Sequence, residues 1–96
     1  MTLKFEWDKG NHRHFYVDNA EREIVIEECE SIFYDSRKKI QFSKVDNFGE
    51  KRYLCLGMSS KNRLLAVAFC IREGLIRPIS SYPVSKPKLR RIYEED

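Results

Sequence analysis

Apolar and polar residues alternate with a period of two in two stretches outside the middle of the chain. Leu3, Phe5 and Trp7 are separated by charged residues, and Ile40 and Phe42 alternate with polar ones. Successive side chains of a β-strand point to opposite faces, so this alternation indicates strands with one buried face. A short strand is therefore expected at each of these places.

Three further strand patterns, joined by short turns, occupy the middle of the chain. Residues 50–56 alternate, residues 64–71 are apolar at both parities, and residues 75–80 follow the pair Glu73-Gly74. A run that is apolar on both faces predicts a central strand. Glycine tolerates the positive φ that a two-residue hairpin turn requires. Pro78 has no N–H donor and predicts a sheet edge or a bulge.

Helical patterns flank these strands and place the chain in the α+β class. Asp8 or Asn11 is expected to cap a short helical turn. Asn19 is expected to cap a longer helix, although an extended piece at residues 23–26 stays open as an alternative. Ser85 is expected to cap a last helix. The predicted fold is a small antiparallel sheet of about four strands, flanked by N-terminal helices and a C-terminal helix.

Composition narrows the class of protein. The 96 residues are expected to form one domain, residues 1–96, because 42% hydrophobic residues suffice for one core. The net charge of +3 is a mild basic bias that leaves the placement of the charges to decide the partner. Cys29, Cys55 and Cys70 lie in apolar runs and predict buried free thiols. No apolar run approaches the roughly 18 residues that cross a bilayer, so a cytoplasmic protein without a membrane partner is expected.

Six short motifs follow one another over nearly the whole chain. In chain order they are Phe5-Glu6-Trp7-Asp8, Glu27-Glu28-Cys29-Glu30-Ser31-Ile32-Phe33, Glu50-Lys51-Arg52 with Gly57-Met58-Ser59, Arg63-Leu64-Leu65-Ala66-Val67, Ile76-Arg77-Pro78-Ile79-Ser80, and Arg90-Arg91-Ile92-Tyr93-Glu94. Their order and spacing resemble the BrnT family of toxins from bacterial type II toxin–antitoxin modules, which have a RelE-like fold. The resemblance implies an RNA endonuclease that uses no metal or cofactor. It also implies a BrnA-like cognate antitoxin, with operator DNA contacted only through the antitoxin complex.

The chain departs from the family pattern at three places. Residues 18–23 fit poorly, the acidic residue expected before the terminal arginine pair is replaced around Lys88-Leu89, and Ser80-Ser81-Tyr82 stands where the family has Ser-Ala-Arg. The last change removes an arginine expected near the active face. An alternative hypothesis is therefore a module that binds RNA or the antitoxin with weakened catalysis. A structural protein without a nucleic-acid partner is a third hypothesis, which salt-independent binding or no binding would favour.

RNA cleavage without metal requires a base for the 2′-hydroxyl, cations for the phosphorane and an acid for the leaving oxygen. Arg52 and Arg77 are the predicted phosphate ligands, with Arg63 as a weaker third, because guanidinium groups bind phosphate in bidentate fashion. Glu50 is the candidate base, and Tyr82 is a candidate for stacking or proton donation. The alternatives are a solvated Glu50–Arg52 pair and a half-buried packing role for the tyrosine.

The C-terminal segment adds a basic face that is a candidate for tracking the RNA backbone. Its candidate RNA-binding residues are Lys86, Lys88, Arg90, Arg91 and Tyr93. The alternative is a solvated helix face with a packed tyrosine. His12 and His14 have a side chain suited to acid–base work. They are weak metal candidates, because no set of cysteines or carboxylates has matching spacing, and a surface or capping role is expected for them.

Overall fold

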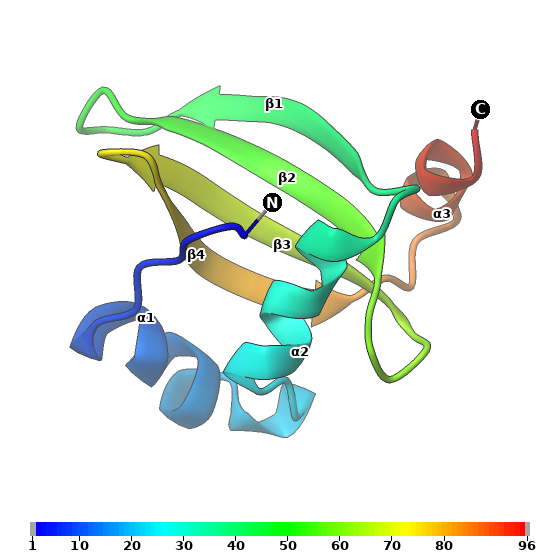
Figure 1. Cartoon of the computed structure of the whole chain (residues 1–96), viewed down its shortest axis with the longest axis horizontal. Helices are drawn as coiled ribbons and strands as arrows, with labels where there is room; N and C mark the ends of the chain where they lie inside the picture. Colours follow the sequence, from blue (N-terminus) through cyan, green and yellow to red (C-terminus); the bar gives the residue numbers. More distant parts are fainter. Residues whose placement is uncertain (1, 96) are drawn as a thin grey trace.

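An antiparallel sheet of four strands forms the centre of the structure, with the strands in the order β1-β2-β3-β4 (Figure 1). The computed structural model describes residues 2–95. The strands are β1 (Lys39–Val45), β2 (Lys51–Met58), β3 (Leu64–Arg72) and β4 (Leu75–Pro83). β3 pairs with β2 on one side and β4 on the other, which confirms the central position predicted for residues 64–71.

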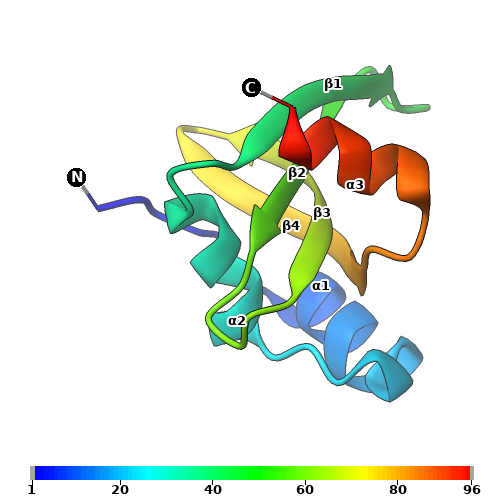
Figure 2. The same cartoon turned by 90° about the vertical axis from the view of Figure 1, so that its right-hand side faces the viewer.

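Helices cover both faces of the sheet. They are α1 (Lys9–Arg13), the π-turn η1 (His14–Asp18), the 3-10 turn η2 (Ala20–Arg22), α2 (Ile26–Ser31), the 3-10 turn η3 (Ile32–Tyr34) and α3 (Pro87–Glu94). The N-terminal helices lie on one face, and α3 lies on the other (Figure 2). The predicted α+β class, with an antiparallel sheet between N-terminal helices and a C-terminal helix, is confirmed.

Each face of the sheet buries its own core. The core toward the N-terminal helices contains Phe15, Ile24, Cys29, Ile32, Phe33, Cys55, Leu65, Val67 and Phe69. The core toward α3 contains Leu56, Leu64, Ala66 and Val84, with Leu89 and Ile92 of α3 packed against them. Because β2 and β3 contribute alternate residues to both cores, they are apolar at both parities. All three cysteines are free and buried, as predicted.

Gly57 allows the N-terminal helices to approach the sheet closely. A Cβ atom at this position of β2 would lie 2.8 Å from the Cβ and the carbonyl oxygen of Ile32 in η3. Real Cβ atoms are almost never that close to their neighbours, so any larger residue would push η3 away from the sheet. The glycine therefore fixes the distance between these two layers.

Two local predictions for the β3–β4 hairpin are confirmed. Glu73 and Gly74 both have positive φ, at 51° and 78°, as a two-residue turn of this type requires. Pro78 lies in edge strand β4 and pairs with Phe69 next to a register shift. Its carbonyl oxygen accepts a hydrogen bond from Asn11 Nδ2 at 2.9 Å, which ties the N-terminal segment to β4.

The helix predicted to start at Asn19 is broken. Glu23 has a left-handed backbone with φ of 54°, Val25 is extended, and α2 begins only at Ile26. The alternative of an extended piece at residues 23–26 is therefore observed at Val25 but not at Glu23 or Ile26. The Asn19 amide donates to the carbonyl oxygen of His14 at 2.9 Å instead of capping a helix. The hydroxyl of Tyr16 accepts the Ile26 N–H at 2.8 Å, so a side chain from η1 satisfies the start of α2.

Both ends of the chain differ from their predictions in detail. The strand expected at the N-terminus is reduced to one parallel bridge between Phe5 and Ile76. Asp8, one of the two candidates, caps α1 by accepting the N–H groups of Gly10 and Asn11. The last helix begins at Pro87, with residue 86 at the cap position in place of the predicted Ser85.

The strand predicted around Ile40 and Phe42 is confirmed, but the buried face predicted for it is wrong. Ile40 and Phe42 are 50% and 56% exposed. β1 is an edge strand, and its apolar side chains extend beyond the part of the sheet that the N-terminal helices cover. Among residues 2–95, no helix is both long enough and apolar enough to cross a membrane.

Candidate active site

Three arginines meet at one end of the sheet, on the face that carries α3. They line a pocket of about 250 Å³, called the arginine pocket below. Its lining residues are Gly10, Asn11, His14, Glu50, Arg52, Cys70, Arg72, Arg77 and Ile79. Two of the arginines, Arg52 and Arg77, are those predicted as phosphate ligands, and Glu50 is the predicted base.

The strand register explains why these side chains meet. Cys70 of β3 pairs with Arg77 of β4, and the pairing of Tyr53 with Phe69 sets Arg52 of β2 beside Cys70. Residues paired across an antiparallel sheet point to the same face, and so do residues two apart on one strand. Arg72, two residues after Cys70, therefore reaches the same face from the end of β3.

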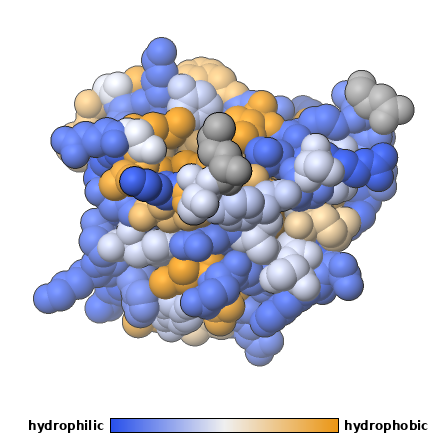
Figure 3. Space-filling view, viewed as in Figure 1, coloured by the Kyte–Doolittle hydropathy of each residue, from blue (hydrophilic) through white to orange (hydrophobic). Residues whose placement is uncertain are grey.

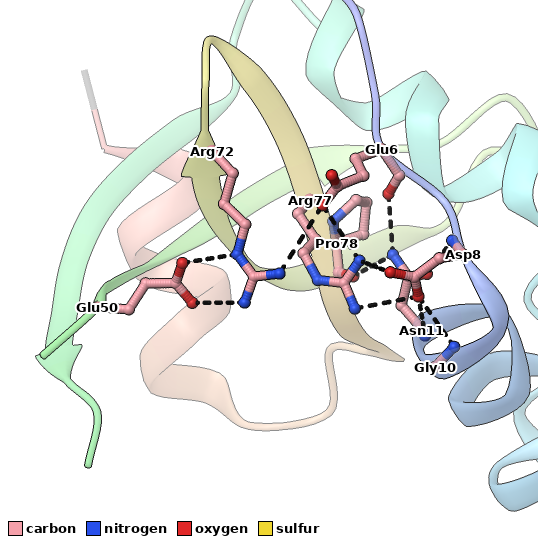
Figure 4. A network of polar contacts seen from close by, with 8 residues as sticks. All are labelled: Glu6, Asp8, Gly10, Asn11, Glu50, Arg72, Arg77 and Pro78. Carbon is pink, nitrogen blue, oxygen red and sulfur yellow. Dashed lines mark hydrogen bonds and ion pairs between the residues drawn. The ribbon is translucent and has the colours of Figure 1, made fainter. Parts of the chain in front are cut away.

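Arg77 is held by two carboxylates of the N-terminal segment (Figure 4). Its Nη1 and Nη2 donate to the two oxygens of Asp8 at 2.6 and 3.1 Å, and Nη1 also donates to Glu6 at 3.2 Å. The hydrogen bond from Arg77 lowers the pKa of Asp8 below its ordinary value, so this carboxylate stays ionised. The fork of the guanidinium is thereby oriented at the rim of the pocket.

Arg72 and Glu50 form the second ion pair of the pocket. Nε and Nη2 of Arg72 donate to the two oxygens of Glu50 at 2.8 and 3.1 Å, and Nη1 lies 4.0 Å from Glu6 (Figure 4). The hydrogen bond from Arg72 lowers the pKa of Glu50. A carboxylate with a lowered pKa is a weaker proton acceptor than a free one. The contacts of Glu50 therefore suit it to position Arg72 more than to act as a base.

Arg52 is fixed through the β1–β2 turn. Its Nε donates to Asp46 Oδ2 at 3.2 Å, and Asp46 Oδ1 accepts the N–H groups of Phe48 and Glu50 at 2.9 Å each. Within residues 2–95, the two terminal nitrogens of Arg52 have no hydrogen-bond partner. Since a guanidinium carries five N–H donors, this side chain has donors to offer to a bound anion.

A histidine and a cysteine complete the pocket. His14 lines it from η1, and its Nε2 lies 3.1 Å from Nδ2 of Asn19. Cys70 lies at the base of the pocket, and burial raises the pKa of its thiol, which therefore stays protonated.

Arg63 lies elsewhere, and the expectation that it converges with the other two arginines is wrong. It stands at the opposite end of β3, seven residues from Cys70, or about 23 Å along an extended strand. Its Nε and Nη2 donate to both oxygens of Glu28 at 2.6 Å, and Ser59 donates to the same carboxylate at 2.7 Å. Glu28 is 1% exposed, and the hydrogen bond from Arg63 lowers its pKa. These contacts make Arg63 a link between α2 and the β2–β3 turn.

Both tyrosines predicted as site residues, Tyr82 and Tyr93, pack against the core on the side of the sheet that α3 covers. Tyr82 is half-buried in the core on that side and is not among the residues that line the arginine pocket. The Tyr93 hydroxyl donates to Asp35 at 2.6 Å, and burial together with this bond raises the pKa of Tyr93 to about 12. A phenol with that pKa is a poor proton donor at neutral pH.

The basic residues of the last helix are exposed on the same side of the sheet as the arginine pocket. They are Lys86, Lys88, Arg90 and Arg91. α3 packs on Leu54 and Leu56, which share a face of β2 with Arg52. The basic surface of α3 and the arginine pocket therefore lie on the same side of the sheet.

A larger pocket, of about 370 Å³, lies between the start of β1 and the end of α3. Glu94 and Glu95 line it beside Lys38 and Lys39, and the ammonium group of Lys39 already bonds the carbonyl oxygens of Tyr93 and Glu95. It lacks a cluster of arginines, so the smaller arginine pocket is the better candidate for binding phosphate.

Sequence reasoning missed Arg72, Glu6 and Asp8 as partners of the site, and it placed His14 outside it. The sequence contained a signal for Arg72, because it lies two residues after Cys70 in β3 and its side chain therefore points to the same face. No local pattern indicates that Asp8 meets Arg77, since these residues are 69 positions apart in the chain. The described residues contain no group of three or more His, Cys, Asp or Glu side chains placed to hold a metal ion.

Several motif residues serve the fold. Phe5 packs edge-on against Phe33 with ring centroids 5.4 Å apart, and Trp7 Nε1 donates to Glu30 at 2.7 Å. Together with the close contact at Gly57, these residues fasten the N-terminal segment and the helices to the sheet. These motif residues therefore stabilise the fold.

Comparison with known proteins assigns the chain to a family. A family model described as "Ribonuclease toxin, BrnT, of type II toxin-antitoxin system" matches residues 7–87, which include the whole sheet and all lining residues of the arginine pocket. A search of curated proteins finds no match. A type II toxin acts with a cognate antitoxin, and a ribonuclease has RNA as its substrate. The chain therefore belongs to the BrnT family of ribonuclease toxins from type II toxin–antitoxin systems.

Proposed function

We propose that the arginine pocket is the site at which this toxin cleaves RNA as an endonuclease, without a metal ion. The observation that carries the proposal is the convergence of Arg52, Arg72 and Arg77 from three strands on one pocket. The 2′-hydroxyl attacks the adjacent phosphorus, so that a 2′-O–P bond forms and the P–O5′ bond breaks. The products are a 2′,3′-cyclic phosphate and a 5′-hydroxyl, and the guanidinium groups stabilise the phosphorane between them.

The carboxylates around the pocket orient the arginines before RNA arrives. Asp8 and Glu50 fix the planes of Arg77 and Arg72, and both carboxylates border solvent. A phosphate can therefore exchange with them at small cost, since water screens ion pairs at the surface and each contributes little. Bidentate bonds from an arginine to two phosphate oxygens replace those to the carboxylate.

His14 is the proposed acid–base group. It lines the pocket beside the arginines, and an imidazole can take the 2′-hydroxyl proton or supply one to the 5′ oxygen. Glu50 acts through Arg72 as a positioning residue. Arg63, Tyr82 and Tyr93 stay outside the proposed site because their contacts serve the fold.

RNA reaches the pocket along α3. Its exposed cations Lys88, Arg90 and Arg91, with Lys86 before it, lie on the same side of the sheet and attract the phosphate backbone. The chain acts as one toxin domain, residues 1–96, in the cytoplasm. A BrnA-like antitoxin neutralises it, and operator DNA is contacted through the antitoxin complex.

A weakened, binding-only function is the second candidate, and one observation favours it. Each arginine of the pocket is already bonded to a carboxylate, and Tyr82 replaces an arginine of the family pattern. If this hypothesis holds, RNA binds the protein in a salt-dependent manner and stays intact.

The test follows RNA integrity with protein made in a cell-free system, which avoids selection against an active toxin. The wild type is expected to cut RNA to fragments with 5′-hydroxyl and cyclic phosphate ends, and Arg52→Ala is expected to cut it much more slowly. Lys44→Ala is the matched control, because Lys44 pairs with Arg52 across the sheet but does not line the pocket. Intact RNA with a folded wild-type protein would overturn the proposal, as would equal loss in both variants.

A further inference from the structure

The sheet has a second uncovered surface, on the face opposite the arginine pocket. It is a groove of about 300 Å³ lined by Phe33, Ile40, Tyr53, Phe69, Ile71 and Ile76, called the apolar groove below. Apolar side chains gather on this face over the sheet in the space-filling view (Figure 3). The N-terminal helices bury one end of this face and leave the end with the groove open to solvent.

The groove is bordered by large apolar side chains that are exposed. Ile71 is 55% exposed, which is similar to the values for Ile40 and Phe42. A register shift after Phe42 pairs Val45 with Lys51, so that Val45 also faces the groove side; an unbroken alternation would have placed Lys44 there. Contiguous apolar surface of this kind on a soluble domain marks an interaction site.

The chemistry of the groove selects the class of partner. Its six lining residues carry no charge, and the Tyr53 hydroxyl is their only polar side-chain group. RNA requires cations and hydrogen-bond donors along its path, so these walls suit a protein segment with apolar side chains. Lys51 extends the same face of β2 beyond Tyr53 and places one positive charge at the end of the groove.

The dimensions of the groove select the kind of segment. It crosses all four strands, from Ile40 in β1 to Ile76 in β4. Neighbouring strands are about 4.8 Å apart, so the groove spans about 14 Å. An α-helix advances about 5.4 Å per turn and would fill it with about three turns. Apolar residues at positions i, i+3 or i+4, and i+7 of one helix face would occupy its length.

We propose that an amphipathic helix of the cognate antitoxin docks in the apolar groove, with an acidic residue near Lys51. The chain belongs to a family of type II toxins, so it has a protein antitoxin whose binding must bury toxin surface. The inference rests on this membership and not on the proposed catalytic residues. Its location on the back of the arginine pocket means that the contact can form while the pocket is open.

The test measures the affinity of the antitoxin encoded beside the toxin gene for groove variants. Phe42→Glu and Ile71→Glu are made in the Arg52→Ala background, which limits toxicity during expression. Both side chains are exposed, so a charge there is tolerated in the free toxin but not in a buried apolar contact. We expect each variant to weaken antitoxin binding by about 30-fold or more in calorimetry.

Two control variants also introduce a glutamate and leave the groove intact. Phe48→Glu changes an aromatic residue that is 94% exposed in the β1–β2 turn, and Lys44→Glu changes the opposite face of β1. Both are expected to bind within about threefold of the parent, because rim and remote positions contribute little. Circular dichroism melting of each variant establishes that it is folded.

Three results would overturn the proposal. The first is unchanged antitoxin affinity in folded Phe42→Glu and Ile71→Glu. The second is a toxin dimer that these variants dissociate while antitoxin affinity stays the same, which would make a second copy the occupant. The third is weaker RNA binding with unchanged antitoxin binding. Because the readout is binding, a toxin that failed to cleave RNA would leave this test intact.

Discussion

Arg63 and Arg77 both bond carboxylates, and the surroundings of those carboxylates separate their roles. Arg63 holds Glu28, which is enclosed between α2 and the sheet and also accepts a bond from Ser59. Arg77 holds Asp8, whose side chain is half-exposed at the rim of a pocket. A buried carboxylate cannot lose its partner without a large desolvation penalty, whereas an exposed one can give way to a phosphate. The same type of ion pair is therefore structural at one end of the sheet, between Arg63 and Glu28, and available for exchange at the other, between Arg77 and Asp8.

The largest expected effect is on stability, from removing the guanidinium at the buried pair. Arg63→Ala leaves the carboxylate of Glu28 buried without its main partner, and we expect a loss of about 3 kcal/mol in the free energy of unfolding. Urea denaturation followed by circular dichroism measures it. The control is Arg13→Ala, whose partner Asp18 is exposed, with an expected loss below about 0.5 kcal/mol. Equal losses in the two variants would remove the distinction between buried and exposed pairs.

The second largest effect is expected on RNA cleavage, from removing the guanidinium that pairs with the half-exposed Asp8. Arg77→Ala is expected to slow RNA cleavage by about 100-fold, since it removes donors from the developing phosphorane charge. Its free energy of unfolding should fall by less than that of Arg63→Ala, because both carboxylate partners of Arg77 are partly exposed. Arg77→Lys keeps the charge without the fork and should recover only part of the rate. A full rate for Arg77→Ala would place the chemistry outside the arginine pocket.

A smaller effect is expected on the free energy of unfolding when the pH is lowered. The folded-state pKa of Glu28 lies below its ordinary value of 4.5, so its pairing stabilises the fold fully above pH 4.5. This contribution is lost as the pH falls from 4.5 through the lower folded-state pKa, where the carboxylate takes up a proton. Glu28→Gln should remove that part of the acid sensitivity. Unfolding free energies of both proteins between pH 6 and pH 3 provide the comparison, and parallel curves would contradict the assignment.

The smallest effect is expected on the salt dependence of RNA binding, from the exposed arginines of α3. Arg90→Ala or Arg91→Ala should reduce the slope of log affinity for single-stranded RNA against log salt by about 0.7 for each phosphate that the variant no longer neutralises. The rate at saturating RNA should stay near that of the wild type. Glu94→Gln in the same helix is the control. A changed rate with an unchanged slope would assign these residues to the site itself.

The strands and turns were predictable from the sequence because they depend on residues close together in the chain. Alternation defined β2 and the continuous apolar run defined β3, while Glu73-Gly74 defined the hairpin between β3 and β4. Pro78 marked the edge strand because it lacks a donor. The helix expected at Asn19 failed because Glu23 takes a left-handed backbone, and Tyr16 then satisfies the start of α2 through a tertiary contact.

The site could be predicted only in part. The sequence identified Arg52 and Arg77, and strand register brings both to the arginine pocket. It added Arg63 as a weaker third phosphate ligand, because each of the three is an arginine in or next to a strand. Strand register alone would have separated Arg63 from Arg52 and Arg77. Arg63 precedes the first residue of β3, whereas the pocket lies at the last residues of that strand. The contribution of His14 arises from the packing of η1 against β4, which has no local pattern.

By itself, the sequence determined the order of the elements, the antiparallel hairpins and the family, because backbone preferences and motif spacing act over short distances. The tertiary structure decided which carboxylate meets each arginine, over separations of 35 residues for Arg63 and 69 for Arg77. It also decided that the apolar face of β1 stays uncovered. An alternating strand specifies two faces but not what packs on them, and that depends on where the helices end over the sheet.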